Sequence, residues 1–580
     1  MKPLLPQDDP KAQARQDRLA KRRETYRYAY DWPPKVATSA ELPRSDDYGP
    51  LYLLESAKVY ASVGVNVAAM AIEGHDAGDL LHTLEKRFAR ASAEELHRFV
   101  FSTPREVAQA APRRRVDSWR DFAAFFATWD APQVVSFYDD PAQTDVAFAW
   151  QRVAGVNPMV LARCDAIPSN LRIDEARFER SIGAGDSLAA AIAEQRLYVA
   201  DYAVLEGVET GVTDGFAKYL CAPIALFVAE RSTRRLHPIA IQLGQTPDAP
   251  VFDRTDGWRW RMAMTLVQSA DANVHEGIYH LGRTHMVMEC VKLAMERQLD
   301  EEHPLYVLLH PHLETTLAIN HSAKTSLIAP GGTVDQCFAP SIDAFASVVK
   351  AALDTYPIRT ASPLEDLERR GLGNVEALEN PYRDDVTLVW GAVERFVSEY
   401  VDVYYATNEA VAGDTELQAF ARELSADDGG RLKDVPVPQT VAELKALIAR
   451  FVFIAGPGHS AVNFPQFPFM GYVPNMPGAS FAPIPTQDVA DDEALLTAMM
   501  PPLRIALEGV TMVYFLSQMR DSKLGHYPPF HFRDGAARDV VDRFQTRLTE
   551  IEAEIETREP SRLMSYPFLK PSLILQSISI

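Results

Sequence analysis

The chain has 580 residues, with 58 lysines and arginines against 79 aspartates and glutamates, and therefore a formal net charge of −21. This acidic balance excludes a general nucleic-acid binder, which needs a basic face to replace phosphate counterions. Hydrophobic residues make up 47% of the chain and charged residues 24%, which excludes wholesale disorder and predicts a globular protein.

The cellular compartment is predicted from cysteine usage and from the first residues. The four cysteines are widely spaced and form no CxxC pair, which argues against a thiolate zinc site or a disulfide scaffold and favours a reducing compartment. The opening MKPLLPQDDP lacks the apolar core of a secretory signal. No window holds eighteen apolar residues. We therefore expect a cytoplasmic protein.

Residues 1–45 are expected to form an N-terminal polar arm. Residues 11–24 (KAQARQDRLAKRRE) are polar nearly all round and include six basic residues. This composition predicts a solvated helix or a strap that lies on the body of the protein. The segment has almost no apolar face to insert, so we expect at most a weak contact with a membrane surface.

Residues 46–580 are expected to form one mainly α-helical domain with a small inserted β-sheet, because no linker, repeat or low-complexity tract divides them. Apolar residues at helical spacing predict helices between 51 and 125. Strand-like pieces between 195 and 245 (RLYVADY, PIALFVAE, HPIAIQL) predict the sheet. Further helices are expected near 262–298, 342–354, 383–405 and 495–519. The Gly- and Pro-rich stretch 455–485 carries five aromatic residues, which predicts a packed irregular segment.

A cluster of histidines marks the longest helical stretch. Seven of the 14 histidines lie between His275 and His321, and three of them are spaced by five residues in HEGIYHLGRTH. On a regular α-helix, positions i and i+5 lie about 140° apart. His280 and His285 can therefore reach one ion only if the helix widens locally, as a π-type turn does. The zinc-protease pattern HExxH needs a spacing of four, so a metalloprotease is a poor match.

Two further features supply oxygen and nitrogen ligands. His459 and Asn463 lie four residues apart, so both point the same way from a helix. The chain ends in KPSLILQSISI, an apolar terminus whose burial would bring the α-carboxylate indoors, where it needs a cation. Imidazoles, an amide oxygen and a carboxylate suit iron or manganese with an open coordination position, and suit zinc less well.

These residues resemble the lipoxygenase family. The stretch from Trp258 to Ile328 matches the family's signature almost position by position, and so do HSAVNFPQFPFMGYVP at 459–474 and the terminal SISI. A weaker resemblance near 147–161 and 194–202 extends the match to about residues 130–580. The resemblance implies a lipoxygenase-type helical catalytic domain.

The resemblance also implies a ligand set for one non-haem iron, with manganese as the alternative. The positions that match the family's ligands are His280, His285, His459, Asn463 and the α-carboxylate of Ile580. Around them, His275 and Gln466 match positions that support the ligands without binding the metal. Asn463 matches a position that is histidine in other members.

The implied reaction is the dioxygenation of a polyunsaturated fatty acid. A ferric hydroxide removes hydrogen from a 1,4-pentadiene of linoleate type, and O₂ adds to the radical to give a hydroperoxide. Ala323 matches a position that is alanine in enzymes making S products, and Cys337-Phe338 matches a pair associated with oxygenation at carbon 13. Position 9 is the alternative. Leu327 and Leu507 are expected to clamp the diene.

The length of the amino-terminal segment bears on how the fatty acid reaches the enzyme. About 45 polar residues precede the helical region, too few for the membrane-docking β-barrel of many eukaryotic lipoxygenases, so we expect a bacterial-type monomer acting on free fatty acid. Within enzymes, the rival is a manganese lipoxygenase. From a different class, the rival is an inactive fatty-acid-binding relic of the same scaffold, which is expected to have lost a ligand or the terminal isoleucine.

Overall fold

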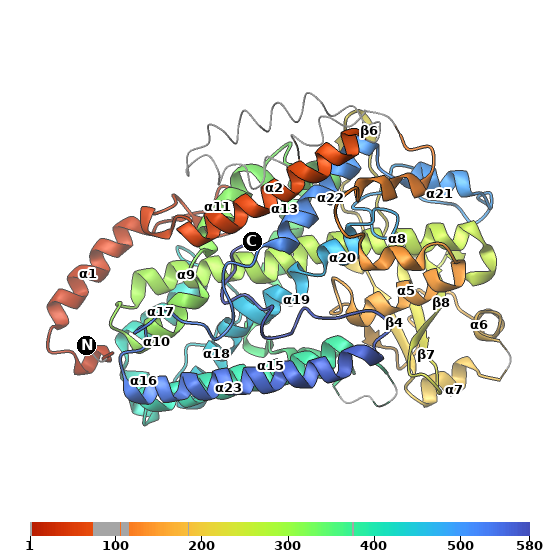
Figure 1. The fold of residues 1–580 in the computed structure, drawn as a ribbon. Helices are drawn as coiled ribbons and strands as arrows, with labels where there is room; N and C mark the ends of the chain where they lie inside the picture. The colour runs from red at the N-terminus through yellow and green to blue at the C-terminus, as the bar shows by residue number, and fades with distance from the viewer. Residues whose placement is uncertain (1–2, 73–104, 106–114, 184, 374–375, 377) are drawn as a thin grey trace.

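The fold is seen in a computed structural model that describes residues 3–72, 105, 115–183, 185–373, 376 and 378–580 (Figure 1). Helices dominate, and a small sheet lies at the end of the molecule opposite α1. The expected mainly helical fold with a small inserted sheet is confirmed. The expected helices between 73 and 104 and between 106 and 114 lie outside the described residues. In the described part, no helix is long and apolar enough to cross a membrane.

One continuous helical rod crosses the molecule and organises the fold. It consists of α8 (Trp258–Val274), the π-helix η7 (His275–Met286) and α9 (Val287–Gln298). Nearly every side chain of the rod is buried, as expected for a helix whose sequence is apolar on all sides. Gly282 lets α13 (Ile342–Asp354) lie close against η7, because a Cβ at this position would meet the Cβ of Ala352 at 3.0 Å.

The sheet has five antiparallel strands in the order β3-β4-β7-β8-β9. The central strand β7 (Ile224–Ala229) is buried along its whole length, with Tyr198 opposite Phe227 in the pairing with β4. Helices α5 (Pro141–Ala154) and α6 (Glu175–Ile182) pack on β8. The other strands are β3 (Ala162–Arg163), β4 (Leu197–Asp201), β8 (Leu236–Gln242) and β9 (Val251–Phe252).

Two long helices form a second layer, drawn below the rod in Figure 1. Helices α15 (Pro381–Tyr404) and α23 (Gly535–Arg558) run side by side, with the rings of Phe396 and Phe544 stacked at 4.3 Å (Figure 1). The remaining α-helices and π-helices are α1 (Ala12–Thr25), α2 (Pro50–Ile72), α7 (Leu188–Ala193), α10 (Pro304–Leu309), α11 (Thr316–Ser322), η9 (Ala323–Leu327), α12 (Thr333–Cys337), α14 (Pro363–Arg369), α16 (Asn408–Gly413), α17 (Thr415–Ser425), α18 (Val441–Phe453), η11 (Ile454–Gly458), α19 (His459–Asn463), α20 (Gln466–Met470), α21 (Glu493–Met499) and α22 (Leu503–Gln518). Short strand pairs are β1 (Tyr28–Ala29) with β2 (Thr38–Ser39), and β5 (Val212–Thr213) with β6 (Phe216–Ala217).

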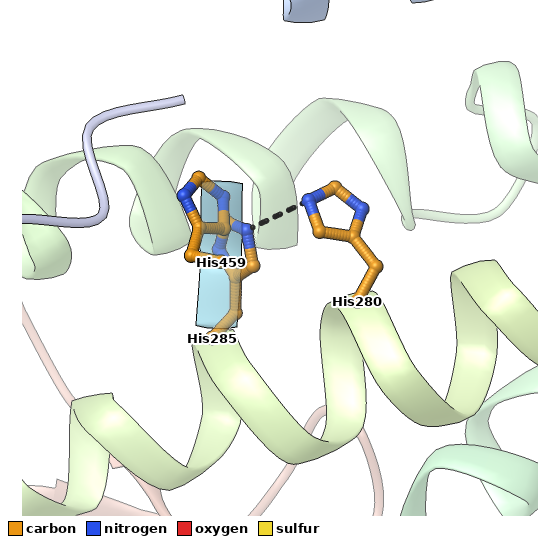
Figure 2. Close-up of side chains that lie close together, drawn as sticks. All are labelled: His280, His285 and His459. Atoms are coloured by element: carbon orange, nitrogen blue, oxygen red, sulfur yellow. Dashed lines mark hydrogen bonds between the residues drawn. The ribbon is translucent and has the colours of Figure 1, made fainter. Parts of the chain in front are cut away.

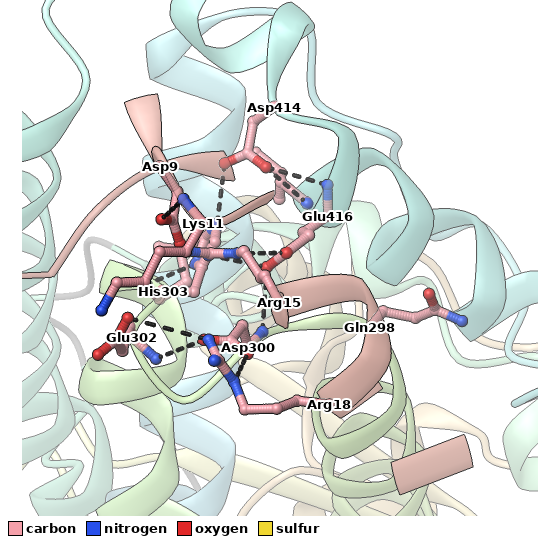
Figure 3. A network of polar contacts seen from close by, with 12 residues as sticks. Asp9, Lys11, Arg15, Arg18, Gln298, Asp300, Glu302, His303, Asp414 and Glu416 are labelled. Carbon is pink, nitrogen blue, oxygen red and sulfur yellow. Dashed lines mark hydrogen bonds and ion pairs between the residues drawn. The ribbon is translucent and has the colours of Figure 1, made fainter. Parts of the chain in front are cut away.

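Helix α1 lies on the body as a strap and is fastened by buried charges (Figure 3). Arg15 is only 1% exposed; its Nε donates to Glu416 at 2.5 Å, and its Nη1 lies 3.1 Å from Asp9. Arg18 forms a bidentate pair with Asp300, both bonds at 2.8 Å. The amino-terminal segment is therefore held by ion pairs as well as by the buried Leu19. The boundary near residue 45 stays a prediction.

Replacing Arg15 by alanine is expected to destabilise the protein by about 3–5 kcal/mol, because Glu416 and Asp9 would stay buried without their cation. Urea unfolding followed by circular dichroism measures the loss. The exposed Lys11→Ala is the matched control on the same strap and is expected to change stability by less than about 0.5 kcal/mol. Equal stability of the two variants would contradict this assignment.

Candidate metal centre

The π-helix η7 brings together two histidines that an α-helix would keep apart. His280 and His285 are spaced by five residues, and η7 spans both of them. A π-helix bonds each N–H to the carbonyl five residues back, so its i and i+5 positions share a face. Figure 2 shows both rings projecting from the same side of the helix. The predicted local widening of this helix is confirmed.

The two imidazoles face each other through the same type of nitrogen. The Nε2 atoms of His280 and His285 are 3.3 Å apart, and both rings are buried. The Nδ1 of His280 lies 3.2 Å from a carboxylate oxygen of Glu276, and the Nδ1 of His285 lies 2.8 Å from Oδ1 of Asn320. Because each Nδ1 faces an acceptor, each carries the ring proton, and both Nε2 atoms are left with a lone pair. Two converging lone pairs at this distance form a site for a cation.

A third imidazole completes the group from a different element. His459 begins α19, directly after the π-helix η11, and its ring centre lies 5.4 Å from that of His280 and 5.0 Å from that of His285 (Figure 2). The side chain is fully buried, yet neither ring nitrogen has a hydrogen-bond partner among the described residues. One nitrogen from each of the three rings falls within 4.8 Å of the others.

The electrostatic surroundings lower the pKa of His285 and of His459. Burial lowers the pKa of His459 well below its usual value, and repulsion from His285 and His280 lowers it further. The nearby backbone of Ile580 opposes the shift, although it does not meet the geometry of a hydrogen bond. Burial likewise lowers the pKa of His285 to about 3. An unpartnered buried imidazole costs free energy unless something binds its lone pair. The orphaned nitrogens of His459 therefore fit a metal ion.

His275 also lies in this region, but its outer nitrogen is engaged elsewhere. Its Nε2 donates to the carbonyl of Val462 at 2.8 Å, which ties η7 to α19. A second group of possible ligands combines His275, Glu276 and His280. We favour the group with His459, because the Nε2 of His275 already has a partner whereas both nitrogens of His459 have none.

Asn463 lies one turn after His459 and is fixed by two neighbours. Its Nδ2 donates to the carbonyl of Leu516 at 2.8 Å, and its Oδ1 accepts from Nε2 of Gln466 at 3.0 Å. These bonds set the amide orientation and leave Oδ1 one further lone pair. Gln466, which the resemblance places in a supporting role, therefore contacts Asn463 directly.

The carboxyl-terminal segment is buried in the core beside η11 and α19. Leu575 N–H donates to Oγ of Ser460 at 3.3 Å, and the carbonyl of Gln576 accepts from Nδ1 of His312 at 3.1 Å. The approach requires a glycine in η11, because a Cβ at Gly456 would lie 2.9 Å from the carbonyl oxygen of Leu575. Ile580 itself is 1% exposed. The terminal residue is therefore withdrawn from water, and a carboxylate buried there would be stabilised by a cation.

Sequence reasoning missed Glu276, which faces Nδ1 of His280, and also Asn320 and Glu289. Asn320 on α11 bonds Nδ1 of His285 through its oxygen, and its Nδ2 donates to Oε2 of Glu289 at 2.9 Å. Glu289 in turn accepts from the N–H of Ser39 at 2.6 Å. The sequence held one signal, since Glu289 is an acidic residue four positions after His285 on a buried helix. Asn320 lies 35 residues from His285, and no spacing rule connects the two.

The predicted pocket residues divide into two sets. Cys337 and Phe338 line a cavity of about 40 Å³, together with Met470, Ile505, Gly509 and Val510. Ala323, Leu327 and Leu507 are buried, but they do not line this cavity. A space of this size holds about one water molecule and is too small for an acyl chain.

Comparison with known proteins places this geometry in a family. The family model described as Lipoxygenase matches residues 105–565. A relative from Pseudomonas aeruginosa, Linoleate 9/13-lipoxygenase, is 38% identical over 491 residues, covering 80% of this chain and 70% of the relative. Polyunsaturated fatty acid lipoxygenase ALOX15B of Homo sapiens is 34% identical over 447 residues, covering 76% of this chain and 66% of the relative.

Solved structures agree with the sequence relatives. The coral 8R-lipoxygenase aligns with a TM-score of 0.86 at 25% identity, and a calcium-dependent 11R-lipoxygenase aligns with a TM-score of 0.85 at 25% identity. Each alignment covers 100% of this chain and 83% of the other. The chain spans about two thirds of the length of the curated relatives named above. With its fold, its family match and its relatives in agreement, this chain belongs to the lipoxygenase family of enzymes.

Proposed function

We propose that the protein is a dioxygenase that converts free polyunsaturated fatty acids of linoleate type into S-hydroperoxides, with oxygen added at carbon 13. The proposal rests mainly on one observation. The Nε2 atoms of His280 and His285 face each other beside the ring of His459, whose nitrogens have no hydrogen-bond partner among the described residues. The name of the Pseudomonas aeruginosa relative supports linoleate as substrate and leaves both carbon 9 and carbon 13 open.

The proposed metal is a single iron held by the imidazoles of His280, His285 and His459, the α-carboxylate of Ile580 and Oδ1 of Asn463. The lipoxygenase family implies a non-haem iron or manganese, and both metals accept nitrogen and oxygen ligands. When bound, the metal supplies the one-electron redox chemistry that removes hydrogen from a 1,4-pentadiene. Elemental analysis of the purified protein distinguishes the two metals, and stoichiometric manganese without iron would replace the iron proposal.

The surrounding residues orient the ligands and exclude water. Glu276 and Asn320 fix the rings of His280 and His285 by holding their Nδ1 protons, as outer partners of metal-bound histidines do. The buried helical rod and the buried carboxyl-terminal segment exclude water from the place where a carbon radical would form.

The substrate is proposed to bind mainly by burying its acyl chain, at about 0.8 kcal/mol per CH₂. Cys337 and Phe338 would contact the chain from the end of α12, which a buried lysine holds in place. Nζ of Lys218 donates to the carbonyl of Asp335 at 2.5 Å and to that of Phe338 at 2.6 Å. Leu327 and Leu507 are proposed to press the diene towards the metal.

Ala323→Gly is expected to shift the product from S towards R, because removing a methyl group beside the radical opens the opposite position to O₂. Chiral chromatography of the reduced product from linoleic acid measures the shift. The volume-conserving Leu327→Met serves as control and is expected to keep S chirality. An unchanged S product from Ala323→Gly would show that this position does not set chirality here.

A second candidate function comes from another relative. Hydroperoxide isomerase ALOXE3 of Homo sapiens is 32% identical over 445 residues, covering 75% of this chain. An isomerase rearranges a hydroperoxide without net oxygen uptake, so feeding linoleic acid and linoleate hydroperoxide separately distinguishes the two reactions. An inactive fatty-acid-binding relic would convert neither. We further propose that the protein acts as a cytoplasmic monomer.

A further inference from the structure

A cavity of about 330 Å³ lies against the histidine-bearing helices and is separate from the cavity beside Cys337. The two cavities share no lining residue. The larger one is bounded by η7, η11, α19 and the connection from α13 to α14. Its volume lies in the range of small-molecule sites.

One wall of this cavity is apolar and comes from the elements that carry the histidines. Ile454 and Phe453 precede the turn to His459, and Ala461 and Val462 follow it. Met159 and Pro357 add to the apolar lining. This wall suits a hydrocarbon chain more than a polar metabolite, because it offers dispersion contacts and few hydrogen bonds.

The polar part of the lining holds an arginine without an anionic partner. Among the described residues, Arg283 makes no hydrogen bond or ion pair, and its Nε is buried and unsatisfied. Its guanidinium lies 4.8 Å from the ring centre of Tyr279 and 5.3 Å from that of Tyr356. The two rings hold the planar cation in place without neutralising it.

The acid in the same cavity is already neutralised by other arginines. Asp366 bonds Arg370 at 2.8 Å and also pairs with Arg369. Arg283 therefore remains as uncompensated positive charge on the lining. A guanidinium fork matches a carboxylate through two parallel hydrogen bonds.

We propose that this cavity is a second lipid site that binds a long-chain carboxylate, with the carboxylate on Arg283 and the chain along the wall formed by η11 and α19. The site is distinct from the one proposed for catalysis and does not depend on the reaction. Its occupant would contact Thr284, next to His285, and Ala461, two residues after His459. Occupancy is therefore expected to alter turnover of a substrate bound elsewhere.

The test is equilibrium binding of palmitate, a saturated fatty acid that has no diene to oxidise. The wild-type protein is expected to bind two equivalents at saturation. Arg283→Gln removes the charge and is expected to weaken one of the two sites by about ten- to a hundredfold, the range for a hydrogen bond to a charged group. Ala361→Trp, which fills the cavity from the α13–α14 connection, is expected to abolish the same equivalent.

The matched control is Arg359→Gln on the same connection. Arg359 pairs with Asp434 and does not line the cavity, so this variant is expected to keep both equivalents. Hexadecanol, which lacks the carboxylate, is expected to bind wild type and Arg283→Gln alike.

Binding of a single equivalent by the wild type, or retention of both equivalents by Arg283→Gln and Ala361→Trp, would overturn the proposal. Linoleic acid turnover is measured in the same proteins to separate the two proposals. Absence of turnover in the wild type would contradict the proposed catalytic function and would leave the second lipid site untouched.

Discussion

His280→Ala is expected to lose its metal and its activity together. The Nε2 atom of His280 lies 3.3 Å from the Nε2 atom of His285, and both atoms offer a lone pair to the proposed metal. No other described side chain replaces His280 in the group of three imidazoles. Outer partners of metal-bound histidines are worth about ten- to a hundredfold in metal affinity, so loss of a ligand should exceed that range. Elemental analysis after dialysis, followed by oxygen uptake with linoleic acid, measures both effects.

His275→Ala is the matched control for that variant. It removes an imidazole from the same π-helix, but one whose Nε2 already bonds the carbonyl of Val462. The expected result is retained metal and a stability loss of about 1–3 kcal/mol from the unpaired buried carbonyl. Loss of the metal in both His275→Ala and His280→Ala would favour the second group, formed by His275, Glu276 and His280, and would contradict this assignment.

Deletion of Ile580 is expected to have an effect of similar size. The deletion moves the α-carboxylate back by one residue, away from the rings that it would join through the metal. The terminus is anchored upstream by Leu575, whose N–H bonds Ser460, and by the Gln576 carbonyl, so it cannot slide forward to compensate. Metal content and oxygen uptake are expected to fall as far as in His280→Ala.

Ile580→Val tests the same point with the carboxylate kept. This substitution removes one methylene and is expected to retain metal and most activity, at a cost of about 0.5–1.5 kcal/mol in stability. A deletion variant that keeps its full metal content would show that the terminal carboxylate is not a ligand.

Much of the site could be predicted because its residues follow local spacing rules. The five-residue interval between His280 and His285 predicted the widened helix, and η7 has that geometry. The interval of four between His459 and Asn463 likewise matches the turn of α19. The expected helix at 342–354 coincides with α13, whose apolar face is periodic.

Other features depend on contacts that no local pattern encodes. The helix expected at 495–519 is interrupted between α21 and α22, because Pro501 and Pro502 cannot continue it. The stretch 455–485, expected to be irregular, contains helices α19 and α20. The bond between Asn320 and His285 joins distant segments. Arg15 looked like a solvated residue, and its burial by Asp9 and Glu416 is set by tertiary packing.

The most direct test is to add linoleic acid to the purified, metal-containing protein and record oxygen uptake and conjugated-diene absorbance in the same sample. Both signals are expected to rise in equal molar amounts, because each turnover fixes one O₂ and conjugates one diene. Absence of both changes in protein shown to contain iron would contradict the proposed dioxygenase function.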